Sequence, residues 1–152
     1  MKRLLILLLW CVCSPAALAA GGRQLPWPVD LSKQSAPAVV VLFSLPNCAY
    51  CEKVRQQTLL YLETDSRYQG RVRVFEVDFQ DRQRRFVWFD ARQYNGLDLG
   101  QLLNVKFSPT VMVFDHQGGV VGKPLLGAGL PDFYGAYVDE LIRSAWAASA
   151  RY

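Results

Sequence analysis

Apolar and polar residues alternate in blocks along the first half of the chain, and these blocks predict three secondary-structure elements. Residues 38–43 form an unbroken apolar run, which is typical of a strand buried on both faces of a sheet. From residue 48 to residue 62, apolar side chains recur at a helical period, with charged and polar residues between them. Residues 71–78 alternate in the manner of a second strand.

The stretch from residue 80 to residue 96 has no single period. A charged segment is followed by an aromatic cluster, and the stretch ends in an Asn-Gly turn signal. It predicts either a small excursion with a short strand or a helix that packs Phe86 and Phe89 inward. Residues 98–105 predict a short helix.

Two further strands and a helix are predicted in the last third of the chain. Residues 110–114 suit another buried strand. Residues 120–126 predict a strand at the sheet edge, because Pro124 cannot donate a backbone hydrogen bond. A final helix is predicted to begin at Pro131. One side of that helix is expected to carry its apolar residues: Phe133, Tyr137, Leu141 and Trp146.

Together these elements predict an α/β fold in one domain. The last two strands follow each other through a Gly-containing turn, so they should be antiparallel, whereas the earlier strands should be parallel. We assign residues 37–150 to this domain. Residues 20–36, which are rich in Gly, Pro and Ser, are assigned to an extended N-terminal arm.

The first 19 residues have the pattern of a cleavable signal peptide. Lys2 and Arg3 precede an apolar run too short to span a bilayer, and residues 17–19 form a small-x-small cleavage pattern. We therefore expect cleavage near Ala19, a periplasmic or otherwise exported location, and a soluble mature protein. The roughly 130 residues that remain suffice for one hydrophobic core.

Loss of this leader changes both the charge and the cysteine count. The formal net charge of the whole chain is +4 at pH 7, and removal of one Lys and one Arg leaves +2. An excess this small does not indicate a nucleic-acid partner. Cys11 and Cys13 leave with the leader, so Cys48 and Cys51 remain as a Cys-x-x-Cys pair.

The sequence Cys-Ala-Tyr-Cys stands where the first buried strand runs into the first helix. Cys48 would lie at the helix N-terminus, where free N–H groups and the helix dipole stabilise a thiolate. Cys51, one turn further, would be shielded, so the pair suits an attacking and a resolving thiol. A metal site and a structural clip stay open as alternatives, although His116 is the only histidine and a four-residue loop stabilises little.

Three segments, in this order, resemble the thioredoxin-like superfamily over nearly all of the mature sequence. VVVLFSLPNCAYC resembles the family's buried strand and active-site helix, VKFSPTVMVFDHQG its cis-proline loop and next strand, and GAGLPDFYGAYVDEL its glycine and last helix. The longer segment before LGQLLNVKFSPT is most similar to small exported (periplasmic, SoxW-like) thioredoxins and to the catalytic domains of bacterial disulfide isomerases. The resemblance implies a thioredoxin fold, with parallel strands and an antiparallel C-terminal hairpin in one mixed sheet flanked by helices.

The same resemblance implies roles for residues around the cysteine pair. Pro109 matches the cis-proline whose loop faces the disulfide, and the backbone of Ser108 would pair with a bound substrate strand. The other expected substrate-binding residues are Ala49, Tyr50 and Thr110.

One position departs from the family pattern. Thioredoxin has a buried aspartate six residues before its first cysteine, which accepts the proton of the resolving thiol, and Leu42 stands at that position here. Glu76 or Asp78, on the neighbouring predicted strand, could substitute as the proton relay. The alternative interpretation of both is a solvated carboxylate at a strand end.

These observations predict an exported, monomeric thiol–disulfide oxidoreductase that reduces or exchanges disulfides in periplasmic proteins. Ala49-Tyr50 contains no histidine to stabilise the thiolate further, which favours a reductase. No Gly-rich dinucleotide loop is present, so no cofactor beyond the disulfide is expected, and a membrane-bound thiol reductant is the expected electron donor. The alternatives are a disulfide isomerase or oxidase of the same fold, and a non-catalytic metal-binding module of the metallochaperone type.

Overall fold

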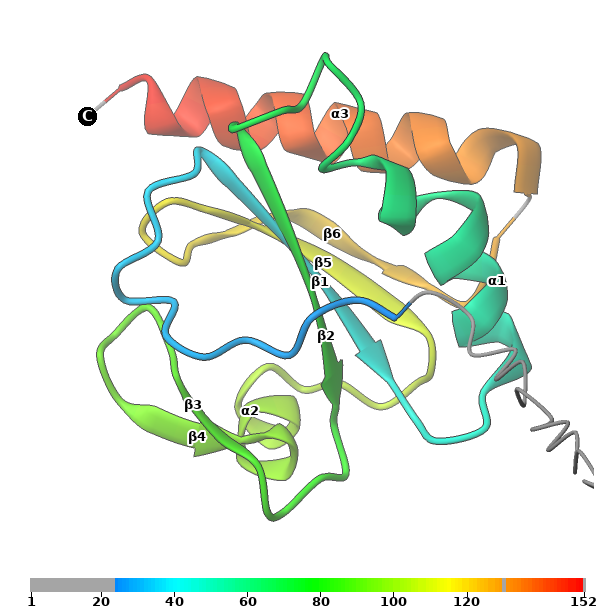
Figure 1. The fold of residues 1–152 in the computed structure, drawn as a ribbon, viewed down its shortest axis with the longest axis vertical. Helices are drawn as coiled ribbons and strands as arrows, with labels where there is room; N and C mark the ends of the chain where they lie inside the picture. The colour runs from blue at the N-terminus through cyan, green and yellow to red at the C-terminus, as the bar shows by residue number, and fades with distance from the viewer. Residues whose placement is uncertain (1–23, 130, 152) are drawn as a thin grey trace, which may run out of the picture.

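The computed structural model describes residues 24–129 and 131–151, so the predicted signal peptide and its cleavage site lie outside the described residues. The strands and helices follow the predicted order (Figure 1). They are β1 (Ala38–Ser44), α1 (Ala49–Gln57), the 3₁₀ turn η1 (Leu59–Tyr61), β2 (Val72–Asp78), β3 (Arg85–Val87), β4 (Gln93–Asn95), α2 (Gly96–Leu102), β5 (Thr110–Asp115), β6 (Val120–Leu126) and α3 (Pro131–Ser149). No helix within the described ranges is long and apolar enough to cross a membrane.

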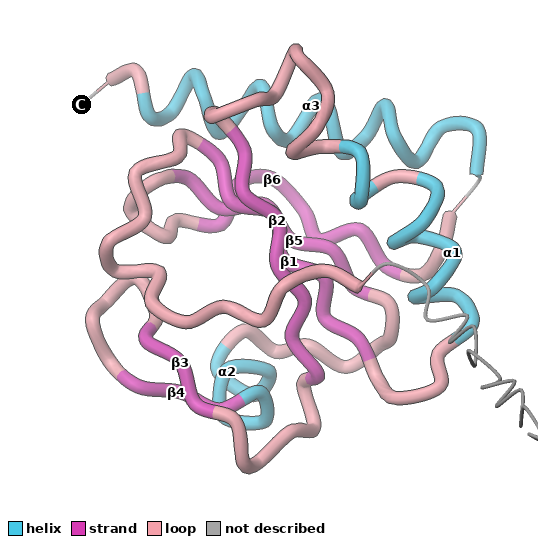
Figure 2. The backbone as a smooth tube through the Cα atoms, in the orientation of Figure 1, coloured by secondary structure: helices cyan, strands magenta, loops and turns pink. Residues whose placement is uncertain are grey.

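Four strands form one mixed sheet in the order β2–β1–β5–β6 (Figure 2). β1 and β2 are parallel, and Leu42 lies opposite Glu76 in their register. β5 runs antiparallel to β1, and β6 runs antiparallel to β5. The predicted α/β fold, with a mixed sheet and an antiparallel C-terminal hairpin, is therefore confirmed.

The central strand β1 is buried along its whole length because both faces of the sheet are covered. Val40 and Leu42 point into the core under α1 and α3. Val39, Val41 and Phe43 point into the other core, which the β3–β4 hairpin and α2 cover (Figure 1). This alternation explains the unbroken apolar run, since every second residue of a strand faces the opposite side.

The segment between β2 and α2 is a two-stranded hairpin, not a helix. β3 pairs antiparallel with β4, and the side chains of Phe86 and Trp88 are buried. The arm packs beside it: Leu31 N donates to Val87 O at 2.8 Å, and Glu76 N donates to Pro26 O at 2.9 Å. The arm thus protects backbone groups on the outer edge of β2.

The Asn-Gly signal marks the start of a helix and not a hairpin turn. The Asn95 side chain accepts a hydrogen bond from Asp98 N at 2.8 Å and so caps α2. A Cβ on Gly96 would collide with the backbone oxygen of Asp78. Glycine is required here because α2 begins directly against the end of β2.

All three predicted helices differ in detail from the structure, and the helix predicted at residues 98–105 covers Gly96–Leu102 instead. The first helix ends at Gln57, because Thr58 leaves the helical conformation, and Tyr61 is exposed. On α3 the predicted apolar side is wrong for its first two residues, since Phe133 and Tyr137 are 56% and 51% exposed, whereas Leu141 and Trp146 are partly buried against the core. The residues that α3 buries fully are each next to a predicted one in the chain: Tyr134, Val138, Ile142 and Ala145. Both stripes are apolar, so periodicity alone did not select the face that packs on the sheet.

Candidate active site

The two cysteines lie where β1 ends and α1 begins. The turn that joins β1 to α1 contains Asn47 in the left-handed conformation (φ 57°), which asparagine tolerates better than most residues. Cys48 is the N-cap of α1, and its sulfur accepts a hydrogen bond from Cys51 N at 3.1 Å. Cys48 and Cys51 form a disulfide with a Cα–Cα distance of 5.2 Å.

The two sulfurs differ in their access to solvent. Cys48 is half-buried, whereas Cys51 is 0% exposed and contributes to the core under α1. An incoming disulfide can therefore reach the first cysteine and not the second. This is the asymmetry that the sequence predicted from the position of the pair at a helix N-terminus.

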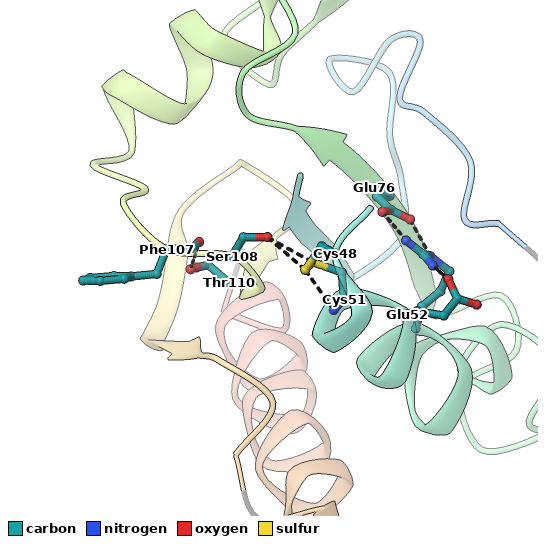
Figure 3. Close-up of a disulfide and its surroundings, with 8 residues drawn as sticks. Cys48, Cys51, Glu52, Glu76, Phe107, Ser108 and Thr110 are labelled. Atoms are coloured by element: carbon teal, nitrogen blue, oxygen red, sulfur yellow. Dashed lines mark hydrogen bonds and ion pairs between the residues drawn. A yellow bond between two sulfur atoms is a disulfide. The ribbon is translucent and has the colours of Figure 1, made fainter. Parts of the chain in front are cut away.

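The loop before β5 brings Ser108 against both sulfurs (Figure 3). The Ser108–Pro109 peptide bond is cis. Ser108 Oγ lies 3.0 Å from Cys51 Sγ and donates to Cys48 Sγ at 3.4 Å. The sequence had assigned only the backbone of Ser108 to the site, and its hydroxyl was missed. The signal was a hydroxyl side chain at the position before the proline.

Two hydrogen bonds hold this loop in place. Thr110 Oγ1 donates to Phe107 O at 2.8 Å, which bridges the two residues between them. Gly127 N, at the end of β6, donates to Pro109 O at 2.8 Å. Thr110 is buried and lies opposite Phe43 in the sheet, so the loop is fixed to the central strand. The position of Ser108 thus rests on rigid elements.

On the other side of the cysteines, charged side chains form a paired cluster. Arg55 donates to both carboxylate oxygens of Glu76, at 2.7 and 2.5 Å, and also pairs with Glu52. The Arg55 and Glu76 side chains are 11% and 15% exposed. As a proton relay, Glu76 would first have to loosen this pair, and its role stays a prediction. The same holds for Asp78, which accepts from Gln80 N at 2.9 Å.

A cleft of about 750 Å³ opens beside this cluster and reaches Cys48. At its rim, Arg84 stacks on Trp27 and pairs with Asp81 at 2.5 Å. Burial alone would raise the pKa of the Asp81 carboxyl, but hydrogen bonds from Arg84 and the backbone outweigh burial, and the pKa is lowered. The other lining residues come from the arm, the turn after β1, α1 and β2: Gln24, Leu25, Ser44, Leu45, Pro46, Asn47, Ala49, Glu52, Arg55, Glu76 and Asp78.

Two aromatic side chains are exposed in the sequence segments that carry the site. Tyr50, between the cysteines, is 67% exposed, and Phe107, directly before Ser108, is 60% exposed. Figure 3 shows the Phe107 ring pointing away from the disulfide. Ala49 is also exposed. Of the predicted substrate-binding residues, Ala49 and Tyr50 are thus open to a partner, whereas Thr110 is buried and supports the loop.

The chemistry available to this arrangement is thiol–disulfide exchange. A reversible two-electron couple is present in the cysteine pair, with one accessible and one shielded sulfur. Within residues 24–129 and 131–151, no group of three or more His, Cys, Asp or Glu side chains is placed to hold a metal ion.

Comparisons with known proteins agree with this fold. Residues 29–132 match the model of a thioredoxin-like domain family. No curated protein matches the sequence. Mitochondrial thioredoxin 3 from Saccharomyces cerevisiae is 16% identical, with 78% of this chain and 93% of that chain covered and a TM-score of 0.52. Trxlp from Edwardsiella tarda is 18% identical, with 70% and 85% covered and a TM-score of 0.51. Thioredoxin O2 from Arabidopsis thaliana is 20% identical, with 69% and 75% covered and a TM-score of 0.50.

Proposed function

Since the chain belongs to the thioredoxin-like domain family and carries a Cys-x-x-Cys disulfide, it is a thiol–disulfide oxidoreductase, and we propose that it acts outside the cytoplasm as a reductase of protein disulfides. The observation that carries the proposal is the difference between the sulfurs, one half-buried at a helix N-terminus and one fully buried behind it. Such a pair can attack a foreign disulfide and then release the product.

The proposed reaction has two exchange steps. The Cys48 thiolate attacks one sulfur of a substrate disulfide, so a Cys48–substrate disulfide forms and the other substrate sulfur leaves as a thiolate that takes up a proton. Cys51 then attacks the Cys48 sulfur, loses its proton, and displaces the second substrate sulfur, which leaves as a thiol. Two electrons have passed from the dithiol to the substrate, and the Cys48–Cys51 disulfide is formed.

The substrate is proposed to be an extended protein segment that docks beside the loop before β5. Backbone groups of Ser108 would pair with it, and Tyr50 would contact its side chains. The 67% exposure of Tyr50 supports this assignment. The proposed mature protein is a monomer that needs no bound cofactor besides the disulfide and no nucleic acid.

The direction of electron flow rests on the dipeptide between the cysteines. Ala49-Tyr50 offers no imidazole that would stabilise the Cys48 thiolate and make the pair strongly oxidising. The proposed electron source is a membrane-bound thiol reductant, because the predicted signal peptide directs the chain away from cytosolic reductants.

Reduction of insulin disulfides in the presence of a dithiol tests the proposed disulfide reductase activity. We expect wild-type protein to accelerate insulin precipitation, and Cys48→Ser to abolish the acceleration. Cys51→Ser should react once and then accumulate as a mixed disulfide, visible as a mass increase under non-reducing conditions. Equal activity of wild type and Cys48→Ser would contradict the proposal.

Export is tested with the full-length chain expressed in a bacterium. We expect the protein in the periplasmic fraction, with its N-terminus near Ala20 by mass spectrometry. Recovery of the intact chain from the cytoplasm would contradict the proposed location. The measured reduction potential of the pair then tests the direction, since a strongly oxidising value would favour an oxidase.

A further inference from the structure

In the part of the chain that the structure describes, one side-chain oxygen lies within hydrogen-bond distance of the Cys51 sulfur. The Cys51 side chain is fully buried, and Leu42 on the adjacent strand is also fully buried and offers no polar atom. Among the described residues, the only hydrogen-bond partner of Cys51 Sγ is Ser108 Oγ, at 3.0 Å. The same oxygen lies 3.4 Å from Cys48 Sγ, so one hydroxyl touches both reacting atoms.

The carboxylates near the site are turned to other partners. Glu76 uses both oxygens to bind Arg55, and the cleft that Glu76 and Asp78 line reaches Cys48 but is not lined by Cys51. In Figure 3, Glu76 lies on one side of the cysteines and Ser108 on the other. A carboxylate would have to reorganise to reach Cys51, whereas the hydroxyl is already in contact.

We propose that the Ser108 hydroxyl is a catalytic group that stabilises the Cys48 thiolate and relays the proton of Cys51 in the resolving step. This inference rests on the proposed function. A hydroxyl suits the role because it donates one hydrogen bond and accepts two, so it can accept from one sulfur while it donates to the other.

In the reduced protein, the Cys51 thiol donates to Ser108 Oγ, and the Ser108 O–H donates to the Cys48 thiolate. A hydrogen bond to the charged form favours that form, and bonds to ionised acceptors are stronger than neutral ones. The hydroxyl therefore increases the fraction of Cys48 that is thiolate near neutral pH.

In the resolving step, the relay keeps atoms and charges balanced. The Cys51 proton passes to Ser108 Oγ while the Ser108 proton passes to the departing substrate sulfur, which is bonded to Cys48 Sγ. The Cys51–Cys48 bond forms, the Cys48–substrate bond breaks, and the substrate leaves as a thiol. Ser108 ends with one proton, as it began.

The loop is built to keep the hydroxyl in place. The hydrogen bond from Thr110 to Phe107 O and the one from Gly127 to Pro109 O lie on either side of the Ser108 backbone. Fixed hydrogen-bond donors need no reorganisation at the moment of reaction.

The test uses the reduced protein and dithiobis(nitrobenzoate), a small disulfide that releases a coloured thiolate twice. The first release reports attack by Cys48, and the second reports resolution by Cys51. We expect Ser108→Ala to slow the second release about tenfold, since the hydroxyl that takes up the Cys51 proton and protonates the departing sulfur is lost. Ser108→Thr, which keeps the hydroxyl, should stay within about twofold of wild type.

Alkylation of reduced Cys48 by iodoacetamide gives a second readout that a packing role would not move. At about pH 6, Ser108→Ala should react several-fold more slowly than wild type, and the difference should vanish at high pH, where every thiol is ionised. Ser108→Thr should follow the wild-type profile.

Equal second-release rates and equal alkylation profiles for wild type and Ser108→Ala would overturn the inference while leaving the oxidoreductase intact. Equal slowing of Ser108→Ala and Ser108→Thr would also overturn it. The threonine variant keeps the hydroxyl, so equal slowing would mean that the change in side-chain shape, and not the loss of the hydroxyl, lowers the rate. A wild-type protein that gives only one release would overturn the proposed function itself, since Cys51 would then not resolve.

Discussion

The two sides of the Cys48–Cys51 disulfide are built from different kinds of groups. On the loop side, the neutral hydroxyl of Ser108 contacts both sulfurs. On the cleft side, Arg55 lies between Glu76 and Glu52, and none of these charged groups has a hydrogen bond to sulfur in the described structure. The charged side has the greater capacity for proton transfer in isolation, yet the neutral side is the one in contact.

The difference follows from the cost of burying charge. A carboxylate that loses water must be paired, and in Glu76 the pairing with Arg55 occupies both oxygens. A hydroxyl is far cheaper to bury and still donates and accepts hydrogen bonds. The paired charges therefore hold α1 against the sheet, whereas the Ser108 hydroxyl is available to the sulfurs.

Removing the charge partner on the cleft side should have the largest effect on stability. Arg55→Leu leaves Glu76 in a largely buried position without a cation, and we expect a loss of about 2 to 4 kcal/mol in the free energy of unfolding. Urea denaturation followed by far-ultraviolet circular dichroism measures it.

Arg67→Leu is the matched control, because Arg67 pairs with Asp65 at 2.7 Å on the surface, with 67% of its side chain exposed. Its free energy of unfolding should change much less than that of Arg55→Leu. Similar losses in the two variants would contradict this prediction, since the Arg55 cluster would then stabilise the fold no more than a surface pair does.

Loosening the loop side should have a smaller effect on stability and a visible effect on chemistry. Thr110→Val removes the donor that holds Phe107 O, and we expect a loss of about 1 to 2 kcal/mol. Because Ser108 is then less well placed, Cys48 alkylation at about pH 6 should slow about threefold.

Thr64→Val is the control for this prediction, since Thr64 Oγ1 also donates to a backbone oxygen, that of Tyr61, but outside the site. It should leave the alkylation profile of Cys48 at its wild-type position. A shift of the same size in both variants would show that the Thr110 bond has no specific effect on the loop.

The smallest effect on the free energy of unfolding is expected for Tyr68, which lies on neither side of the disulfide. Tyr68 donates to Asp139 at 2.5 Å, and burial, followed by this hydrogen bond, raises the pKa of Tyr68 to about 12. The neutral phenol is favoured in the folded state, so its contribution to stability is complete below pH 10, the ordinary pKa of tyrosine, and is lost as the pH rises toward 12.

Tyr68→Phe should therefore lower the free energy of unfolding by about 1 kcal/mol or less at neutral pH. Above pH 10 its unfolding curve should depend less on pH than that of wild type. Denaturation midpoints across that range measure the difference. Parallel curves for the two proteins would contradict the raised pKa, and a change in Cys48 alkylation would mean that Tyr68 is not independent of the site.

Elements that are buried on both faces were the easiest to predict. The bounds of β1 and β5 lie within a residue of the predicted runs, because a short continuous apolar stretch is typical of a strand that is buried on both faces. The hairpin of residues 85–95 was left undecided, since its aromatic residues suit a helix and a strand equally. The start of the α3 face was predicted wrongly because Tyr134 and Phe133 are both apolar, and only contact with the sheet distinguishes them.

The redox pair could be predicted from the sequence, because Cys48 and Cys51 are one helical turn apart and follow a strand that is buried along its whole length. It also identified the loop that faces them. The contact between the Ser108 hydroxyl and the sulfurs depends on the folded chain, because Ser108 is 57 residues from Cys51 and reaches the sulfurs only when β5 pairs with β1. The pairing of Arg55 with Glu76 likewise follows only from the fold, since the two residues are 21 positions apart and meet where α1 packs on the sheet.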